Sequence, residues 1–277
     1  MSTRVGFIGL GNIGKPMALN VAKAGFDLMV YDLREEPLAE LAAAGAKTAR
    51  SAHEIGAHGE VIELVVVDDA QVEAVALEEG GVLSGAQPGS VIAVHSTVHP
   101  RTIRKLAELA GERGVSVIDA EVSGGERGAQ AQTLCYMVGG EAAAFEKCRP
   151  VFETSGANIF HLGELGMGAM AKLAHNLIVY VNMLSASEGM RLAETAGLDL
   201  SAFQEVVKAG AGQSRVADNW LAQRNFKDTY TSGPDALVQL MHKDLRLALE
   251  LGHDVGVSLP GAALAQQLIE RFLGIKE

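Results

Sequence analysis

A glycine-rich run near the start of the chain, Gly9-Leu10-Gly11-Asn12-Ile13-Gly14, constrains the fold more than any other feature. The apolar segment Arg4 to Ile8 before it predicts a short buried strand, and the segment Asn12 to Ala24 predicts a helix. In such a turn the first glycine allows a tight bend, the second lets the backbone approach a pyrophosphate, and the third permits close helix packing. The helix N-terminus adds N–H donors. The run therefore predicts a dinucleotide-binding βα turn.

An acidic residue follows at the expected distance. Phe26 to Tyr31 predicts a second strand, and Asp32 stands at its end, about 20 residues after the glycines, where a carboxylate accepts hydrogen bonds from the adenosine ribose. The charge of Asp32 repels a 2'-phosphate and so favours NAD, while Arg34 could pair with that phosphate. We expect NAD as the preferred cofactor, with NADP possible.

The rest of the chain divides into two patterns. Strands and helices alternate up to His161, which predicts a mostly parallel, doubly wound sheet, and the remainder shows helical periodicity only. Leu173, Leu177, Val181 and Leu184 form an apolar stripe on one long helix, Ala169 to Ala196, and about four further helices follow. We predict a Rossmann-type α/β domain at residues 1–163 and an all-helical domain at residues 164–277.

Charge and composition exclude several classes of partner. The net charge of -11 opposes binding to nucleic acid or to an anionic membrane. The longest apolar stretches fall short of the roughly 18 residues of a membrane helix. The two cysteines, Cys135 and Cys148, have neither redox-pair nor zinc-site spacing. We expect a cytoplasmic protein without a metal or a membrane segment.

Two polar segments follow predicted strands, at the edge of the sheet where ligands bind. Ser96 and Thr97 could face a nicotinamide or its ribose, or could cap the helix that begins at Pro100. Ser123-Gly124-Gly125 could hold a carboxylate through a hydroxyl and backbone N–H groups, or could be a flexible loop. The residues alone leave both pairs of alternatives open.

Lys172 and Asn176 stand one turn apart on the long helix, after Gly166-Met167-Gly168. Beside a nicotinamide, in a closed cleft, the lysine amine could exchange a proton with a substrate oxygen, and Asn176 could orient both groups. Most helix lysines are solvent-facing and inert, so this interpretation depends on context. His175 fits an interhelical hydrogen bond better than a proton carrier.

The ordered motifs of the chain resemble those of the 3-hydroxyacid dehydrogenase family, typified by 3-hydroxyisobutyrate and tartronate semialdehyde dehydrogenases and distantly related to 6-phosphogluconate dehydrogenase. The resemblance spans nearly the whole sequence. It rests on residues 6–17, Ser96-Thr97, residues 119–125 with Gly128-Ala129 and Thr133-Leu134, residues 137–140, residues 166–176, and Lys243-Asp244-Leu245 with residues 248–250.

The resemblance implies a role for each matched residue. Thr97 and Lys243 would contact the cofactor, Ser123 and Gly124 would hold a substrate carboxylate, Lys172 would be the general acid/base, and Asn176 would orient it. It also implies a Rossmann domain followed by a helical domain built around a long interdomain helix, in homodimers or homotetramers. Three residues depart from the family pattern in segments expected to line the substrate cleft, and these departures bear on the substrate: Glu121 for proline, Gln132 for glycine and His175 for asparagine.

The sequence therefore predicts an oxidoreductase that transfers a hydride between a nicotinamide cofactor and a small 3-hydroxy acid or its semialdehyde or keto acid. An imine reductase on the same scaffold is the enzymatic alternative, against which the presence of Lys172 argues. A redox-silent dinucleotide-binding interaction protein is the alternative from another class. The side chain of the substrate and the direction of the reaction stay open.

Overall fold

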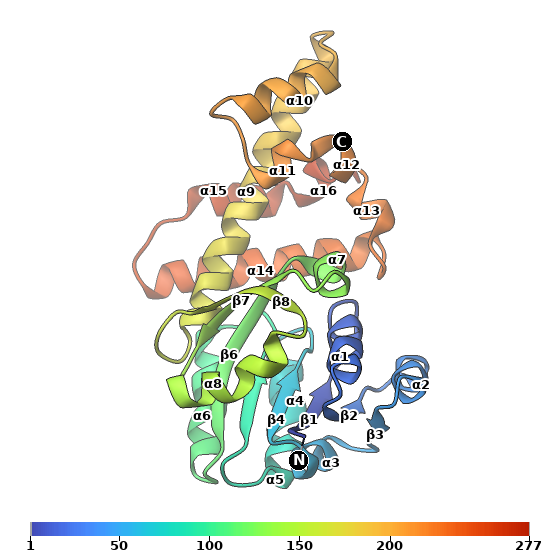
Figure 1. The fold of residues 1–277 in the computed structure, drawn as a ribbon. Helices are drawn as coiled ribbons and strands as arrows, with labels where there is room; N and C mark the ends of the chain where they lie inside the picture. Colours follow the sequence, from blue (N-terminus) through green and yellow to red (C-terminus); the bar gives the residue numbers. More distant parts are fainter. Residues whose placement is uncertain (1, 277) are drawn as a thin grey trace. The chain divides into compact units, whose positions relative to one another are not determined.

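A computed structural model describes residues 2–276, and the chain forms two compact units that meet between Lys172 and Leu173. We call them the sheet unit and the helical unit. The described residues of the sheet unit contain one eight-stranded sheet in the order β3-β2-β1-β4-β5-β6-β7-β8 (Figure 1). Neighbouring strands are parallel except β6 and β7. The strands are β1 (Arg4–Ile8), β2 (Asp27–Tyr31), β3 (Lys47–Thr48), β4 (Val61–Leu64), β5 (Val91–Val94), β6 (Ser116–Ser123), β7 (Leu134–Gly139) and β8 (Gly156–His161).

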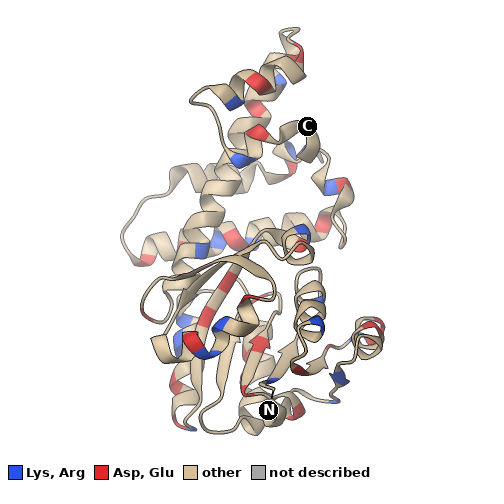
Figure 2. Cartoon of the chain, in the orientation of Figure 1, with Lys and Arg blue, Asp and Glu red and all other residues tan. Residues whose placement is uncertain are grey.

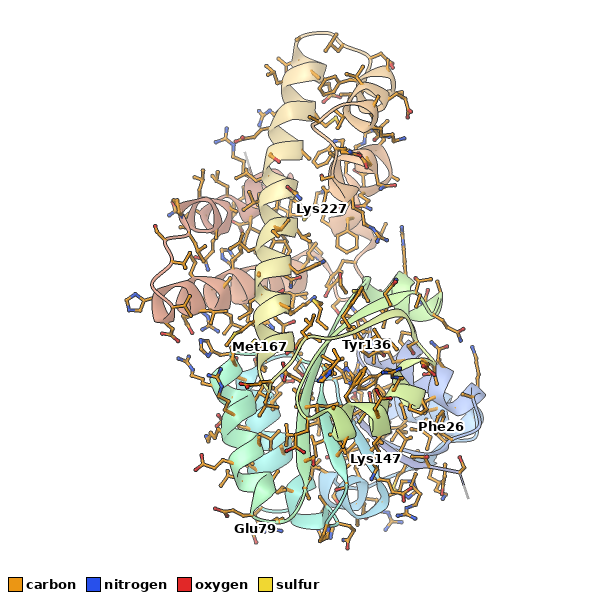
Figure 3. All side chains as sticks on the ribbon, turned by 60° about the vertical axis from the view of Figure 1, so that its left-hand side comes forward. Phe26, Glu79, Tyr136, Lys147, Met167 and Lys227 are labelled. Atoms are coloured by element: carbon orange, nitrogen blue, oxygen red, sulfur yellow. The ribbon has the colours of Figure 1, made fainter. Side chains whose placement is uncertain are left out.

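Helices cover both faces of this sheet, because the buried strands carry apolar side chains on each side. One core packs against α1 (Gly14–Lys23), α2 (Glu35–Ala43), α7 (Gly125–Gln130) and α8 (Ala142–Phe152). The other packs against α3 (Ala52–His58), α4 (Asp69–Leu77), α5 (Val82–Gly85) and α6 (Pro100–Gly111). In Figure 3, Tyr136 of β7 marks the first core, where its ring stacks on Phe152 of α8.

Only helices occur among the described residues of the helical unit. The 29-residue helix α9 (Met167–Thr195) begins in the sheet unit and continues into the helical one. Tyr180 and Leu184 of α9 pack with Leu245 and Ile269 in the core of the helical unit. The remaining helices are α10 (Leu200–Ala209), α11 (Arg215–Asp218), α12 (Trp220–Gln223), α13 (Phe226–Thr229), α14 (Pro234–Asp254), α15 (Pro260–Gln267) and α16 (Ile269–Phe272).

The predicted fold class is confirmed, with differences in detail. Seven helices, not about four, follow α9 in the described residues, since four of them span a single turn that periodicity does not detect. The apolar run from Val61 to Val67 predicts one strand over its whole length, but β4 ends at Leu64. The backbone N–H groups of Val66 and Val67 donate to the side chains of Ser96 and Gln71 instead of to a neighbouring strand. None of the helices within residues 2–276 has the length and apolar character that a membrane crossing requires.

Candidate active site

The glycine turn between β1 and α1 has the geometry that its residue types predict. Gly9 has a φ of +93°, and a Cβ there would lie 2.2 Å from the Val65 carbonyl oxygen. A Cβ on Gly14 would lie 2.0 Å from the Gly9 carbonyl oxygen, so this glycine lets the helix start pack on the turn. Gly11 has open space around its Cβ position, and no acidic residue occupies the first turn of α1. These features fit a pyrophosphate at the helix N-terminus.

Asp32 is tied to this turn. One carboxylate oxygen accepts from the Leu10 backbone N–H at 2.7 Å, and the other accepts from the Arg34 backbone N–H and Nε. Arg34 in turn donates to the Leu10 carbonyl oxygen at 2.8 Å. Partial burial raises the pKa of Asp32, but hydrogen bonds from Arg34 and Leu10 outweigh it and leave the pKa below its ordinary value. The carboxylate therefore stays charged beside the turn.

The segment after β5 is fixed by polar contacts. Ser96 Oγ accepts from the Val66 backbone N–H at 3.0 Å, and Thr97 is half-buried. The cap of α6 is His99, whose Nδ1 accepts from the Arg101 backbone N–H, so capping by Ser96 or Thr97 is ruled out. His95 is a buried histidine with both ring nitrogens satisfied, by Glu63 and by the Ala120 carbonyl oxygen.

β6 presents a stripe of polar side chains on one face, since alternate residues of a strand share a face. Asp119 and Glu121 are both fully buried there, and Ser123 is half-buried at the strand end. Figure 2 shows this strand with acidic segments along it. Asp119 caps α9 by accepting from the backbone N–H groups of Gly166 and Ala169, at 2.7 and 2.8 Å. Glu121 lies beneath the same helix start, which is why it does not line an open surface as its segment led us to expect.

Lys172 lies at the end of this stripe. Its Nζ donates to the Val122 carbonyl oxygen at 2.8 Å, one residue before Ser123. Gly124 and Gly125 follow with φ angles of +132° and +61° and are exposed. Cys135 of β7 pairs in register with Ser123. Within the sheet unit, the structure thus brings the lysine, the serine and the two glycines to one place.

Asn176 and Lys243 belong to a second group of contacts, inside the helical unit. Asn176 Nδ2 donates to Asp244 Oδ2 at 2.7 Å, and the Tyr180 hydroxyl donates to the same oxygen at 2.8 Å. Lys243 Nζ lies 3.2 Å from Asp244 Oδ1, and its side chain is only 11% exposed. Lys243 is therefore a largely buried charge paired with Asp244.

Sequence reasoning missed Asp244 as a functional residue. Its side chain is fully enclosed and holds Asn176, Tyr180 and Lys243 together. The one signal that could have found it was a carboxylate directly next to a lysine at an apolar position of a helix. His175 contacts Asn176 Oδ1 through Nδ1 at 3.2 Å, so it interacts with its chain neighbour on α9.

Gln132 departs from the resembled pattern at a constrained position. Its φ of +59° lies in the left-handed region, in which glycine is favoured. All other described residues with a positive φ are glycines. The Gln132 amide lies 3.5 Å from the Asn20 side-chain oxygen. Asn20, buried in α1, donates to the Ala129 carbonyl oxygen at 2.8 Å. These hydrogen bonds connect α7 and the loop after it to α1, the helix that follows the glycine turn.

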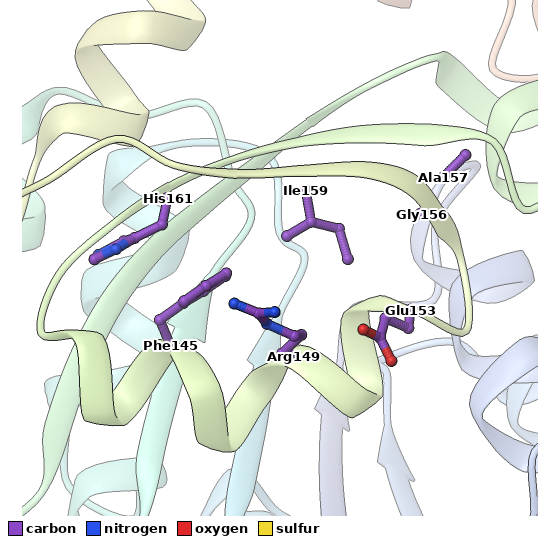
Figure 4. Close-up of a pocket in the computed structure, with 7 residues that line it drawn as sticks. All are labelled: Phe145, Arg149, Glu153, Gly156, Ala157, Ile159 and His161. Carbon is purple, nitrogen blue, oxygen red and sulfur yellow. The ribbon is translucent and has the colours of Figure 1, made fainter.

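A separate pocket of about 310 Å³ lies between α8 and β8 (Figure 4). Phe145 stacks on His161 there, with ring centroids 4.8 Å apart, and the Arg149 guanidinium lies over the Phe145 ring. None of the candidate residues lines it. Its lining consists of Phe145, Arg149, Glu153, Gly156, Ala157, Ile159 and His161.

Comparison with known proteins covers both units. Residues 4–163 match the family described as the NAD binding domain of 6-phosphogluconate dehydrogenase. Residues 166–274 match the family described as NAD-binding of NADP-dependent 3-hydroxyisobutyrate dehydrogenase.

Individual relatives that match nearly the whole chain are also dehydrogenases. The 2-(hydroxymethyl)glutarate dehydrogenase of Eubacterium barkeri is 38% identical over 99% of this chain and 91% of its own. The NAD-dependent L-serine dehydrogenase of Pseudomonas aeruginosa is 38% identical over 98% of this chain and 92% of its own. The structure of Mycobacterium tuberculosis 3-hydroxyisobutyrate dehydrogenase with L-serine has a TM-score of 0.84 at 30% identity and covers 99% of this chain and 94% of that one.

Imine reductases are more distant. The structure of an imine reductase from Pseudomonas sp. has a TM-score of 0.67 at 19% identity, over 99% of this chain and 96% of that one, and it shares the fold alone. With its two family matches and relatives along the whole sequence, the chain is an NAD(P)-dependent oxidoreductase that belongs to the 3-hydroxyacid dehydrogenase family.

Proposed function

We propose that the protein is an NAD-preferring dehydrogenase that interconverts a small 3-hydroxy acid and its semialdehyde or keto acid. One observation carries the proposal: the Lys172 amine donates to the Val122 carbonyl oxygen at 2.8 Å, directly beside Ser123 and the two exposed glycines. An ionisable amine next to hydroxyl and backbone N–H donors can handle a proton close to a bound carboxylate. The substrates named for the relatives, L-serine among them, support this acid class.

Each candidate residue then has a task. Ser123 and the backbone N–H groups of Gly124 and Gly125 hold the carboxylate, which fixes the carbon that bears the hydroxyl. Asn176 orients the hydroxyl oxygen. In oxidation, neutral Lys172 accepts the hydroxyl proton as a hydride leaves the carbinol carbon, and in reduction the ammonium of Lys172 donates a proton to the carbonyl oxygen. Bound nicotinamide supplies the hydride acceptor or donor.

The cofactor assignment follows from the glycine turn. Gly9, Gly11 and Gly14, with the backbone of Asn12 and Ile13, would receive the pyrophosphate. Asp32 would accept from the adenosine ribose hydroxyls, and its negative charge disfavours a 2'-phosphate. The engagement of Arg34 with Asp32 and Leu10 supports NAD over NADP. Thr97 and Lys243 would complete the cofactor contacts.

The same proposal extends to organisation and surroundings. It places the boundary between the cofactor-binding and helical domains at residues 163 and 164, in the stretch that separates the two family matches. We further propose a cytoplasmic homodimer or homotetramer. Its partner molecules would be small carboxylates rather than nucleic acid or membrane, in keeping with the net charge of -11.

Replacement of the lysine tests the chemistry. Lys172→Ala should lower kcat for a 3-hydroxy acid by about 10³-fold, within the range ascribed to general acid–base catalysis, and should leave the Kd for NADH nearly unchanged. The matched control is Lys105→Ala, because Lys105 is an exposed lysine that pairs with Glu73 on the surface of the sheet unit. A panel of 3-hydroxy acids assayed with NAD and with NADP supplies the substrate. Normal turnover of Lys172→Ala would refute the assignment.

A further inference from the structure

Glu121 has no task in the mechanism above, yet its surroundings are unusual. The side chain is fully buried in β6. Beyond its own backbone N–H, neither carboxyl oxygen has a hydrogen-bond partner among residues 2–276. An unpaired buried carboxyl is costly, so its retention calls for a physical reason.

The first turn of α9 rests directly on this carboxyl. A Cβ on Gly168 would lie 2.9 Å from Glu121 Oε2 and 2.9 Å from Asp119 Oδ2. Lys172 stands one turn further on the same helix and donates to the carbonyl oxygen of Val122, the residue after Glu121. Glu121 therefore lies beneath the turn that carries the candidate acid/base.

Two charged groups act on Glu121, and two further titratable groups lie on neighbouring elements. Asp119 is its neighbour on the same face of β6, and Lys172 lies on α9. Cys135 of β7 lies opposite Ser123, and Arg104 of α6 lies near Gly166 at the helix start. Burial, and next the charge of Asp119, raise the pKa of Glu121 well above its ordinary value, while Lys172 opposes the shift. Burial raises the pKa of Cys135, again with Lys172 opposing.

We propose that Glu121 is a positioning residue that acts through Lys172, as a buried carboxyl whose charge state is coupled to that of the lysine. This inference rests on the proposed function of Lys172 and deepens it. Because its pKa is raised, the Glu121 carboxyl keeps its proton to higher pH than an exposed glutamate, and in that form it adds no second negative charge beside Asp119. As the pH rises, loss of its proton creates a carboxylate that favours the ammonium form of Lys172, so the two groups share one titration. The ammonium needed for reduction then persists to higher pH.

Neutral replacements of Glu121 test the coupling. In Glu121→Gln the carboxylate cannot form, so Lys172 should lose its proton about one pH unit lower, the size of shift expected from one nearby charge. We measure kcat/KM against pH for both directions. The midpoints of the alkaline limb of reduction and of the acid limb of oxidation should both move to lower pH by that amount. A purely structural role would lower both rates without moving either limb. Glu121→Asp keeps a titratable carboxyl, so both limbs of its pH profile should lie close to those of wild type.

Direct titration of the amine makes the test independent of substrate. The ¹³Cε signal of Lys172, identified by its loss in Lys172→Ala, is followed against pH in the free protein, in wild type and in Glu121→Gln. Glu121→Met, a second neutral variant of similar size, covers the case in which the glutamine variant does not fold. The control is Glu63→Gln, because Glu63 is buried in the opposite core of the same sheet and pairs with His95.

The two proposals fail in different ways. A Lys172 midpoint that is the same in wild type and in folded neutral variants overturns the coupling. Lack of turnover on every 3-hydroxy acid, with a shifted Lys172 midpoint, contradicts the proposed function and leaves the coupling in place.

Discussion

A single buried carboxylate fixes the orientation of Asn176. Asp244 is an acceptor only, so the amide nitrogen of Asn176 must face it, at 2.7 Å, and the amide oxygen is directed to the His175 side. Tyr180 donates to the same carboxylate oxygen, and burial, with Asp244 next, raises the pKa of that phenol well above its usual value. The hydroxyl therefore stays a donor at any pH at which the protein is assayed.

Asp244→Asn should disturb this arrangement. Its amide can present a nitrogen where a carboxylate oxygen accepted two hydrogen bonds, so Asn176 can turn around. We expect kcat/KM for the hydroxy acid to fall by up to about 10²-fold, the size of effect that a misplaced orienting group can have. Asp235→Asn is the matched control, because Asp235 is exposed in the first turn of the same helix, α14. Kinetics of Asp244→Asn that equal those of the control would remove Asp244 from the site.

At the scale of elements, the junction of β6 with the start of α9 places Lys172. Asp119 closes the helix N-terminus, and a carboxylate there satisfies two backbone donors that the helix itself cannot. Gly168 lets the backbone sit on the strand, since a Cβ would come within 2.4 Å of the Met137 carbonyl oxygen. Glycine is required by this close approach, whereas most other positions in a helix tolerate a side chain.

Two glycines of α9 should therefore respond oppositely to alanine. Gly168→Ala should lower the free energy of unfolding by about 2 kcal/mol, an ordinary cost of overpacking, and should reduce turnover because Lys172 moves with the turn. Gly189→Ala should raise it by up to about 1 kcal/mol, because Gly189 is exposed, helical and has open space at its Cβ position. Urea unfolding and kcat of both variants decide the matter. Equal effects would contradict the packing argument.

Elements could be predicted from sequence where the local pattern was distinctive. α9 was predicted to within two residues at its start because its apolar residues recur at helical spacing, and the short strand β1 was predicted with its observed bounds because its apolar run directly precedes the glycine turn. β3, α3, α5 and α7 were not predicted. α3, for example, contains Gly56, and a Cβ there would lie 2.1 Å from the Val82 carbonyl oxygen. Its glycine serves a tertiary contact that local propensity cannot indicate.

For the molecule as a whole, the parts of the site that lie within a short stretch of sequence could be predicted, and those formed by distant segments could not. The glycine turn and Asp32 lie within about one βα unit of sequence, so their spacing alone indicated them. Contacts between distant segments had no such signal: Asp119 caps a helix 47 and 50 residues away, and Asn176 meets Asp244 across 68 residues. Helical spacing indicated Lys172 and the resemblance supplied Lys243, but neither indicated the burial of Glu121 or the carboxylate that holds Asn176.

The pH dependence of global stability follows from shifts of opposite sign. Asp27, Asp32 and Glu60 have lowered pKa values, mainly through contacts with Lys47, Arg34 and Arg4, so their contributions are present above their unfolded pKa values and are lost as the pH falls. Glu121 acts in the other direction. Because its folded pKa is raised above 4.5, the folded state binds the extra proton, and stability falls as the pH rises from about 4.5 towards that folded pKa.

The free energy of unfolding should thus decline on both sides of a maximum, and Glu121→Gln should flatten the alkaline side only. The stability difference between this variant and wild type, from urea unfolding at pH 5, 6, 7 and 8, should increase steadily with pH, because in wild type the unfolded chain releases the Glu121 proton that the folded chain keeps. Glu79→Gln, the loss of an exposed carboxyl in the loop after α4 (Figure 3), should give a difference that does not change with pH. A constant difference for Glu121→Gln would mean that Glu121 does not hold its proton in the folded protein.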